Sequence, residues 1–529
     1  MALARAHSVA LTGVQGHMVD VEAHIANGLP GFSLVGLPDA ALAEARARVR
    51  AAVANSGHDW PQRRLTVALS PATLPKAGAH FDLSIALAVL GAADVVPRAA
   101  LDDVVVLGEL GLDGRVKPVR GTLPSVLAAS CAGRRRFVVP EPNVAEARLV
   151  QDAEVFGIRS LRQAIALLRD EEVPDEPASP HEEVVDDKTL RSRTDHLERL
   201  DLAEVLGQAA ARRALEVAAA GGHHLFLSGP PGAGKTMLAE RLPGLLPDLT
   251  LSEALEVTAI YSVAGLLPAD APLLTRPPFC DPHHSASLPA IVGGGARVAR
   301  PGAVSLAHRG VLFLDEAPEF KPSVLDALRQ PLEHGEVVIA RSGGTVRMPA
   351  RFQLVLAANP CPCGQAYGKG LYCTCSPQAR SRYQQRLSGP IRDRIDLYQP
   401  VEPVARAEMV ADQRLVESTA VVAERVRAAR ERQRHRYADT PWTLNAHVPG
   451  YELRRRWPPD HDALPAVEEL LASGAISARG VDRVLRVAWT VADLAGRARP
   501  GRRDVLTALT LRLGYEPRLA GRQRQRRVG

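Results

Sequence analysis

The sequence has few aromatic residues, few lysines and no long apolar run. Phe, Trp and Tyr make up 4% of the 529 residues, which argues against a surface that reads nucleic-acid bases mainly by stacking. The stretch that comes closest to a membrane span, 84–96, contains Asp94 and is shorter than the roughly 18 residues such a helix needs. Because no basic segment followed by an apolar one opens the chain, we expect no secretory signal, no membrane partner and a cytoplasmic location.

Positive charge is carried almost wholly by arginine. The net charge is +6 and the isoelectric point is about 9.1. This balance permits a nucleic-acid partner, and it fits equally well a basic enzyme without one. Lysine occurs only six times, so each can be considered singly, and Lys235 lies in a glycine-rich segment.

Length and composition fit roughly three domains, and a hydrophobic content of 46% allows sizeable cores. Residues 1–168 alternate strand-like and helical patterns, which predicts an α/β domain. We expect four further parts: an acidic linker, a core that carries the motifs below, a helical region and a basic tail. Their predicted ranges are 169–197, 198–402, 403–516 and 517–529. Within the helical region, 405–437 has the pattern of one long charged helix.

A phosphate-binding loop is the clearest motif. The apolar segment 225–228 runs into a glycine-rich turn that opens a helix, which is the strand–loop–helix context of this motif. Backbone N–H groups of such a loop surround phosphates, the lysine reaches the β and γ phosphates, and the hydroxyl binds Mg²⁺. The residues of the loop are Gly229, Pro230, Pro231, Gly232, Ala233, Gly234, Lys235 and Thr236.

Two later strands end in polar residues suited to the same site. An apolar segment from Gly310 ends in Asp315 and Glu316. In the same domain as a phosphate-binding loop, this pattern predicts that Asp315 joins the Mg²⁺ shell and that Glu316 polarises the attacking water. The strand 352–358 ends in Asn359, whose amide would orient water beside the γ-phosphate; a plain turn before Pro360 is the alternative interpretation.

Four cysteines form two pairs, Cys361 with Cys363 and Cys373 with Cys375. Four thiolates can close the tetrahedral shell of a structural Zn²⁺ site. We therefore predict a zinc-binding insertion at 361–375, with four reduced thiols in a loop as the alternative.

The motifs together resemble the YifB/ComM family, magnesium-chelatase-like AAA+ ATPases linked to competence. The resemblance spans nearly the whole chain and is closest in the segments 282–287, 300–310, 328–333 and 359–364. It implies an α/β fold with an AAA+ P-loop core and a C-terminal helical lid, preceded by a Lon-protease-like α/β domain. It also implies ATP and Mg²⁺ as cofactors and a homo-oligomeric ring, expected to be a hexamer.

Further site residues follow from this resemblance. Gln208 lies in the segment that helps to seat adenine, Arg394 corresponds to the arginine finger offered to a neighbouring subunit, and Arg479 corresponds to the sensor arginine of the lid. Arg392 is close enough to Arg394 to be mistaken for the finger, and a surface salt bridge is the alternative interpretation of each arginine. Two short strands, 337–341 and 345–348, meet at a Gly-Gly turn and predict a hairpin. Related motors place such a hairpin in the central pore, so Arg341 and Arg347 are expected to contact DNA phosphates, with a purely structural hairpin as the alternative.

The amino-terminal part is expected to be catalytically dead. The segment 69–78 resembles the Lon protease domain, but His80 stands where the nucleophilic serine would be. A serine–lysine pair cannot be assembled from these residues, which leaves a platform for DNA or a partner.

The leading interpretation is an ATP-dependent DNA helicase that promotes branch migration in recombination and natural transformation. Single-stranded or branched DNA and recombination proteins are the expected partners. The alternatives are a chelatase-type motor subunit and a regulatory ATPase that does not act on DNA.

Overall fold

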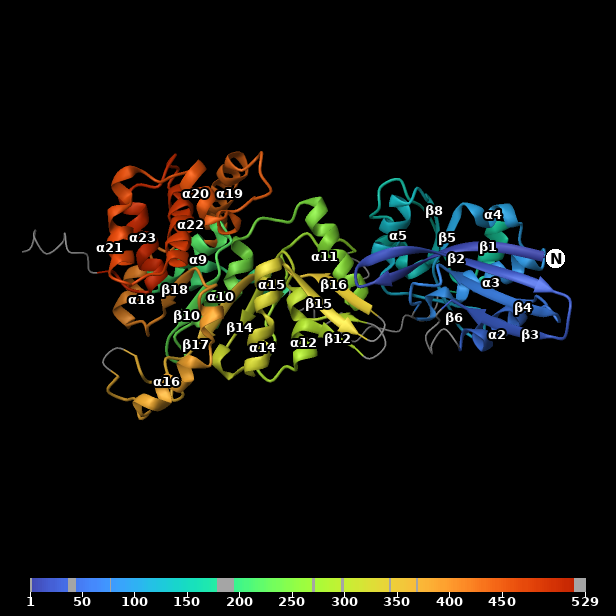
Figure 1. Cartoon of the computed structure of the whole chain (residues 1–529), viewed down its shortest axis with the longest axis horizontal. Helices are drawn as coiled ribbons and strands as arrows, with labels where there is room; N and C mark the ends of the chain where they lie inside the picture. The colour runs from blue at the N-terminus through green and yellow to red at the C-terminus, as the bar shows by residue number, and fades with distance from the viewer. Residues whose placement is uncertain are drawn as a thin grey trace, which may run out of the picture.

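A computed structural model describes residues 2–36, 44–76, 78–177, 195–268, 272–295, 299–341, 344–367 and 370–517. Figure 1 shows an elongated molecule, with the amino-terminal sheet at one end, a second sheet in the middle and the carboxy-terminal helices at the other end. Most of the acidic linker and the basic tail, predicted as 169–197 and 517–529, lies outside the described residues. None of the helices in the described ranges is both long enough and apolar enough to cross a bilayer.

The amino-terminal domain is built on a mixed sheet of seven strands, in the order β3-β4-β2-β1-β5-β8-β9. The strands are β1 (Ala2–Thr12), β2 (Gln15–Ala26), β3 (Gly31–Val35), β4 (Arg64–Ser70), β5 (Val104–Val106), β8 (Arg136–Pro140) and β9 (Glu154–Ile158). Alternate residues of β2 and β4 are buried, as expected for strands with one face on a core. The main helices are α2 (Ala45–Asn55), α3 (Asp82–Ala92), α5 (Thr122–Cys131) and α7 (Leu161–Leu168).

The core domain has a parallel sheet of five strands, in the order β11-β14-β17-β10-β18. Its strands are β10 (Leu225–Ser228), β11 (Phe279–Cys280), β14 (Val311–Leu314), β17 (Gln353–Ala358) and β18 (Leu397–Pro400). Every residue of β14 and β17 is buried. Because both faces of a parallel sheet are covered, its central strands are continuous apolar runs, and this is why the sequence located β10, β14 and β17. The helices α9 (Ala209–Gly221) and α10 (Lys235–Leu245) flank β10 along the chain.

The carboxy-terminal region is helical, as predicted, but the single helix expected at 405–437 is wrong. Two helices, α18 (Arg406–Asp412) and α19 (Thr419–Arg436), occupy this stretch. The break has a physical cause, because residues on both sides of it bind the core. Asp412 accepts hydrogen bonds from Arg212, and the Thr419 N–H donates to the carboxylate of Asp201 over 2.8 Å. The remaining helices are α20 (Gly450–Arg456), α21 (Pro465–Ala472), α22 (Ala478–Leu494) and α23 (Arg502–Leu513).

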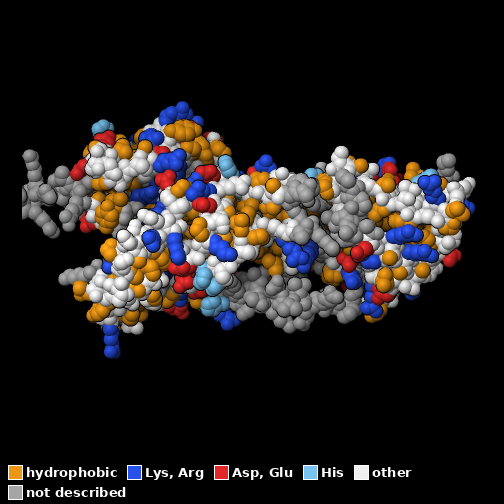
Figure 2. All heavy atoms as spheres, turned by 60° about the horizontal axis from the view of Figure 1, so that its bottom comes forward, with side chains coloured by type: hydrophobic (Ala, Val, Ile, Leu, Met, Phe, Trp, Pro, Cys, Tyr) orange, Lys and Arg blue, Asp and Glu red, His pale blue; other side chains and the backbone are white. Residues whose placement is uncertain are grey.

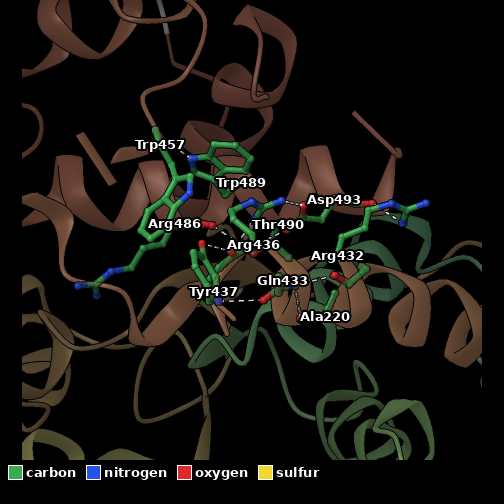
Figure 3. A network of polar contacts seen from close by, with 12 residues as sticks. Ala220, Arg432, Gln433, Arg436, Tyr437, Trp457, Arg486, Trp489, Thr490 and Asp493 are labelled. Atoms are coloured by element: carbon green, nitrogen blue, oxygen red, sulfur yellow. Dashed lines mark hydrogen bonds and ion pairs between the residues drawn. The ribbon is translucent and has the colours of Figure 1, made fainter. Parts of the chain in front are cut away.

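A buried polar network fastens this lid to the core (Figure 3). Asp493 on α22 is ion-paired with Arg436 on α19, and the Arg436 guanidinium lies 4.0 Å from the ring centre of Trp489. Gln433 donates to the backbone oxygen of Ala220 at the end of α9 over 3.0 Å. Since the network joins three helices through satisfied groups, lid and core form one packed unit.

The amino-terminal domain contacts the core at two places. Glu146 accepts a hydrogen bond from the Ser262 hydroxyl on α11 (Leu251–Ala264). The β1–β2 turn lies against the hairpin formed by β15 (Glu336–Arg341) and β16 (Gly344–Pro349). At Gly13, where φ is 67°, an added Cβ would lie only 2.8 Å from the backbone oxygen of Arg347. The turn therefore packs backbone to backbone on β16.

Candidate active site

The polar residues predicted for the nucleotide site come together at the carboxyl edge of the parallel sheet. The loop 229–234 follows β10, Asp315 follows β14 and Asn359 follows β17. Parallel strands present their carboxyl ends at one edge, where open α/β sheets bind their ligands. The strand order brings β17 beside both β10 and β14, so Asn359 stands between the loop and the carboxylates.

Lys235 is held inside the phosphate-binding loop. Its Nζ donates to the backbone oxygens of Gly229 and Pro230 over 2.8 and 2.9 Å, and to Oδ1 of Asn359 over 3.1 Å. Burial lowers the pKa of Lys235, while Asp315 and Glu316 oppose that shift. The hydrogen bond to Asn359 brings Lys235 together with the amide predicted to orient water beside the γ-phosphate.

Thr236 and Asp315 fit a magnesium ion. The Thr236 hydroxyl lies at the first turn of α10 and donates to Oδ2 of Asp315 over 2.7 Å. Hydroxyl and carboxylate oxygens are the hard ligands that Mg²⁺ prefers beside nucleotide phosphates. Thr236 at the start of α10 and Asp315 after β14 thus bring their oxygen atoms together, as a shared metal shell would need.

Glu316 has an unusual backbone conformation. Its φ is 49°, in the left-handed region that residues other than glycine rarely adopt, and its N–H donates to Oδ1 of Asp315. Such conformations persist where the surroundings fix them, often at functional sites. The Glu316 carboxylate lies 3.3 Å from Nδ1 of His284. His284 thus holds the residue predicted to polarise water.

Gln208 is buried and adjoins the loop. Its amide donates to the backbone oxygen of Glu402 over 2.7 Å and to that of Ala233 over 3.3 Å. The predicted adenine-side residue therefore lies against the phosphate-binding loop.

Arg394 is grouped with other guanidinium groups, and within the described ranges it makes no hydrogen bond or ion pair with residues 229–236. It is ion-paired with Glu333 and donates to the backbone oxygen of Pro390 over 2.7 Å. Burial lowers the pKa of Arg394, and Arg483, Arg329 and Arg479 lower it further. A concentration of positive charge that is only partly balanced favours the approach of an anion.

Arg479 lies with Arg394 and not with the loop of its own chain. At the start of α22 its side chain is 81% exposed and lies 3.3 Å from the carboxylate of Asp393. Within the ranges that the structure describes, it makes no hydrogen bond or ion pair with residues 229–236. Arg483, one turn later, pairs with the buried Asp396. Two ion pairs thus join the segment 393–396 to α22.

The predicted hairpin is present as β15 and β16. Arg347 is 62% exposed and pairs with Glu336. The side chain of Arg341 and the residues 342–343 lie outside the described part, so the prediction for Arg341 stays a prediction.

The four cysteines converge. Their sulfur atoms all lie within 4.8 Å of one another, with separations of 3.4, 3.6 and 3.7 Å among Cys361, Cys363 and Cys373. Tetrahedral zinc with Zn–S bonds of about 2.3 Å separates its ligand sulfurs by about 3.8 Å. The positions of the four sulfur atoms therefore fit a zinc ion.

The amino-terminal domain offers no serine nucleophile at the predicted position. Lys76 is buried and donates to the backbone oxygen of Pro71. Ser84 is buried inside α3 and donates to the backbone oxygen of Phe81. His80 contacts the backbone oxygen of Val9.

Known proteins resemble this chain over nearly its whole length. It is 53% identical to an uncharacterized protein of Mycobacterium tuberculosis (strain ATCC 25618 / H37Rv), over 97% of this chain and 99% of the other. It is 42% identical to competence protein ComM of Haemophilus influenzae, over 94% of both chains, and 42% identical to protein YifB of Salmonella typhimurium, over 93% and 94%. The chain belongs to the YifB/ComM family.

Models of magnesium-chelatase parts match consecutive segments of the chain. Residues 201–409 match "Magnesium chelatase, subunit ChlI", residues 21–143 match "Subunit ChlI of Mg-chelatase", and residues 416–512 match the carboxy-terminal part of that subunit. Like other members of the YifB/ComM family, the protein is therefore an AAA+ ATPase, whose cofactors are ATP and Mg²⁺.

Sequence reasoning missed three side chains that contact predicted site residues. His284 faces Glu316, Glu333 holds Arg394, and Tyr383 packs against the backbone of Asn359. His284 and Glu333 lie in the segments 282–287 and 328–333, which carry the family resemblance, so their position in those segments was an available signal.

Proposed function

We propose that this member of the YifB/ComM family is an ATP-driven DNA helicase that works as a ring, expected to be a hexamer, and promotes branch migration. Recombination and natural transformation are the processes it would serve, in line with the name of the competence protein that it resembles.

The observation that carries the proposal is the position of the hairpin. β15 and β16 lead directly into β17, and Asn359 at the end of β17 bonds Lys235. A change at the γ-phosphate would reach the hairpin through a single strand. An exposed arginine such as Arg347 can then bind and release the DNA backbone in step with ATP hydrolysis, without reading sequence.

The arginines support a ring. Arg394 and Arg479 lie together, joined to Asp393 and the lid, and neither contacts the loop of its own chain within the described residues. In a head-to-tail ring, one subunit presents such groups to the nucleotide of the next. Glu333 occupies Arg394 until a phosphate competes for it.

The four cysteines are proposed to hold one structural Zn²⁺, and the division into an amino-terminal domain, core and lid at the predicted boundaries remains a proposal. Metal analysis of the purified chain should give about one zinc per subunit. A folded chain that contains no metal would contradict this.

The experiment for the main proposal measures ATP hydrolysis with no DNA, single-stranded DNA, duplex DNA and four-way junctions. Strand exchange is then followed on the DNA that stimulates most. Stimulation by branched or single-stranded DNA with strand exchange is the expected result. ATP hydrolysis that no DNA changes would favour a chelatase-type or regulatory ATPase.

A further inference from the structure

Acidic residues are absent from one long stretch of the sequence. No Asp or Glu occurs from Val337 to Arg392, although the chain has 59 acidic residues in 529. Over the same stretch stand eight basic residues: Arg341, Arg347, Arg351, Lys369, Arg380, Arg382, Arg386 and Arg392. Where such a stretch is exposed, its charge favours a polyanion. It contains both the β15–β16 hairpin and a second element, the cysteine insertion.

The cysteine knuckle, defined as residues 361–367 and 370–375, displays apolar and aromatic side chains. Leu371 and Tyr372 are 80% and 78% exposed, and Tyr367 is 36% exposed. The rings of Tyr367 and Tyr372 make no aromatic or cation–π contact within the described residues. The chain has only eight tyrosines, and three of them, Tyr367, Tyr372 and Tyr383, lie within 17 residues. Low aromatic content elsewhere makes this concentration notable.

Basic side chains follow the knuckle on α16 (Pro377–Gln385). Arg382 is exposed and has no ion-pair partner among the described residues. Arg380 donates one N–H to the backbone oxygen of Cys375 over 3.2 Å, and likewise has no described carboxylate partner. In Figure 2 this corner lies at the lower left and shows apolar side chains with blue side chains at its edge. Arginines without a carboxylate partner remain available to phosphates.

The knuckle is also fixed to the nucleotide site at two points. An added Cβ at Gly364, where φ is 76°, would lie 2.5 Å from Cδ of Pro231 in the phosphate-binding loop. Tyr383 on α16 is buried and lies against the backbone of Asn359, and burial raises the pKa of Tyr383 to about 12. A ligand that orders the knuckle would therefore act directly on Pro231 and Asn359.

We propose that the cysteine knuckle and α16 form a second nucleic-acid contact, separate from the hairpin, which binds unpaired nucleotides. Tyr372, with Leu371 beside it, is the platform on which an unpaired base stacks, and Arg380 and Arg382 bind the adjoining phosphates. Every base has a π-face, so this contact tolerates any sequence but requires a base that is free of its partner strand. The inference rests on the proposed action on DNA.

The first test compares affinities of the full-length, zinc-containing protein for a labelled single strand and for a labelled duplex of equal length, with a non-hydrolysable ATP analogue. Tyr372→Ala should weaken single-strand binding about tenfold, because stacking contributes about 1–3 kcal/mol per base, and should change duplex binding by less than about twofold. Tyr372→Phe should retain most of the affinity. Tyr515→Ala removes another exposed tyrosine, which is 62% exposed and follows α23, and serves as the matched control.

The second test uses charge. The double variant Arg380→Gln/Arg382→Gln should lower the slope of log K against log salt for single strands by about 1.4, since each phosphate contact contributes about 0.7. Arg502→Gln/Arg503→Gln removes the same charge from exposed positions on α23 and should leave the slope unchanged.

Three results would overturn the inference. Equal single-strand affinity of wild type and Tyr372→Ala would remove the knuckle from DNA while leaving the proposed motor intact. If Tyr372→Ala binds DNA normally but light scattering shows that its oligomers dissociate, the knuckle contacts a second copy of the chain and not DNA. If the wild-type protein binds no DNA, the proposed function itself is contradicted.

Discussion

The arrangement of Lys235 and Arg394 predicts that two inactive variants restore each other. Lys235 lies in the phosphate-binding loop with three oxygen acceptors within 3.1 Å. Arg394 lies elsewhere, beside Glu333 and the lid. If each nucleotide site combines Lys235 of one subunit with Arg394 of the next, Lys235→Ala and Arg394→Ala damage opposite sides of the same interface.

The magnitude follows from counting interfaces. Each variant alone should lose about 10³-fold or more in kcat, as removal of an arginine finger does. In a ring mixed one to one, half of the subunits keep Lys235 and half of the neighbours facing them keep Arg394. About one quarter of the sites are then complete, so the mixture should regain about one quarter of wild-type activity.

The assay is steady-state ATP hydrolysis. The two variants are first mixed, their rings are dissociated into folded subunits by dilution, and the subunits are reassembled at higher concentration. Co-assembly is checked by capture through a tag on one variant. Arg392→Ala, which changes an exposed arginine two residues from Arg394, is the matched control and should remain active by itself. Mixed rings that co-assemble yet stay as inactive as the separate variants would refute the composite site.

Three further predictions concern single residues. Glu316→Gln should bind ATP normally but hydrolyse it at least about 10²-fold more slowly, because the group that polarises water is lost; filter binding with single-turnover assays checks this, and normal turnover would contradict it. Arg341→Ala or Arg347→Ala should each lower the slope of log K against log salt for DNA by nearly one, and an unchanged slope would move DNA away from the hairpin. Asp412→Asn should lower the free energy of unfolding by about 1–3 kcal/mol at neutral pH. The Arg212 hydrogen bond holds the pKa of Asp412 below its usual 3.8, so this stabilisation is present above that pH and is lost as the pH falls below it. Denaturant unfolding at several pH values should therefore show variant and parent converging in acid, and a constant difference would contradict the reasoning.

The sequence located elements whose signals are local. β10 occupies the predicted 225–228, and the loop that follows reaches Lys235 as expected, because a buried parallel strand is one apolar run and the loop has a fixed spacing. The cysteines converge for the same reason, since their pairs are only nine residues apart.

Contacts between segments that are far apart in the sequence could not be predicted from local patterns. His284 reaches Glu316 because β11 lies beside β14 in the sheet, and strand order has no local signal. The break between α18 and α19 depends on Asp201, more than 200 residues earlier. The helical periodicity of the sequence continues through this break. The Asp201 carboxylate, which binds the Thr419 N–H at the start of α19, belongs to another part of the chain and leaves no local signal.

The turn at Gly13 has a mechanical consequence. A larger side chain there has no space, since the backbone of β16 fills it. If the hairpin moves while this contact is kept, the β1–β2 turn and the seven-stranded sheet attached to it must move with the hairpin. Under the proposed action on DNA, the amplitude of the hairpin's movement would then depend on how firmly the amino-terminal domain holds this turn, and a loose turn would let the hairpin move without the domain.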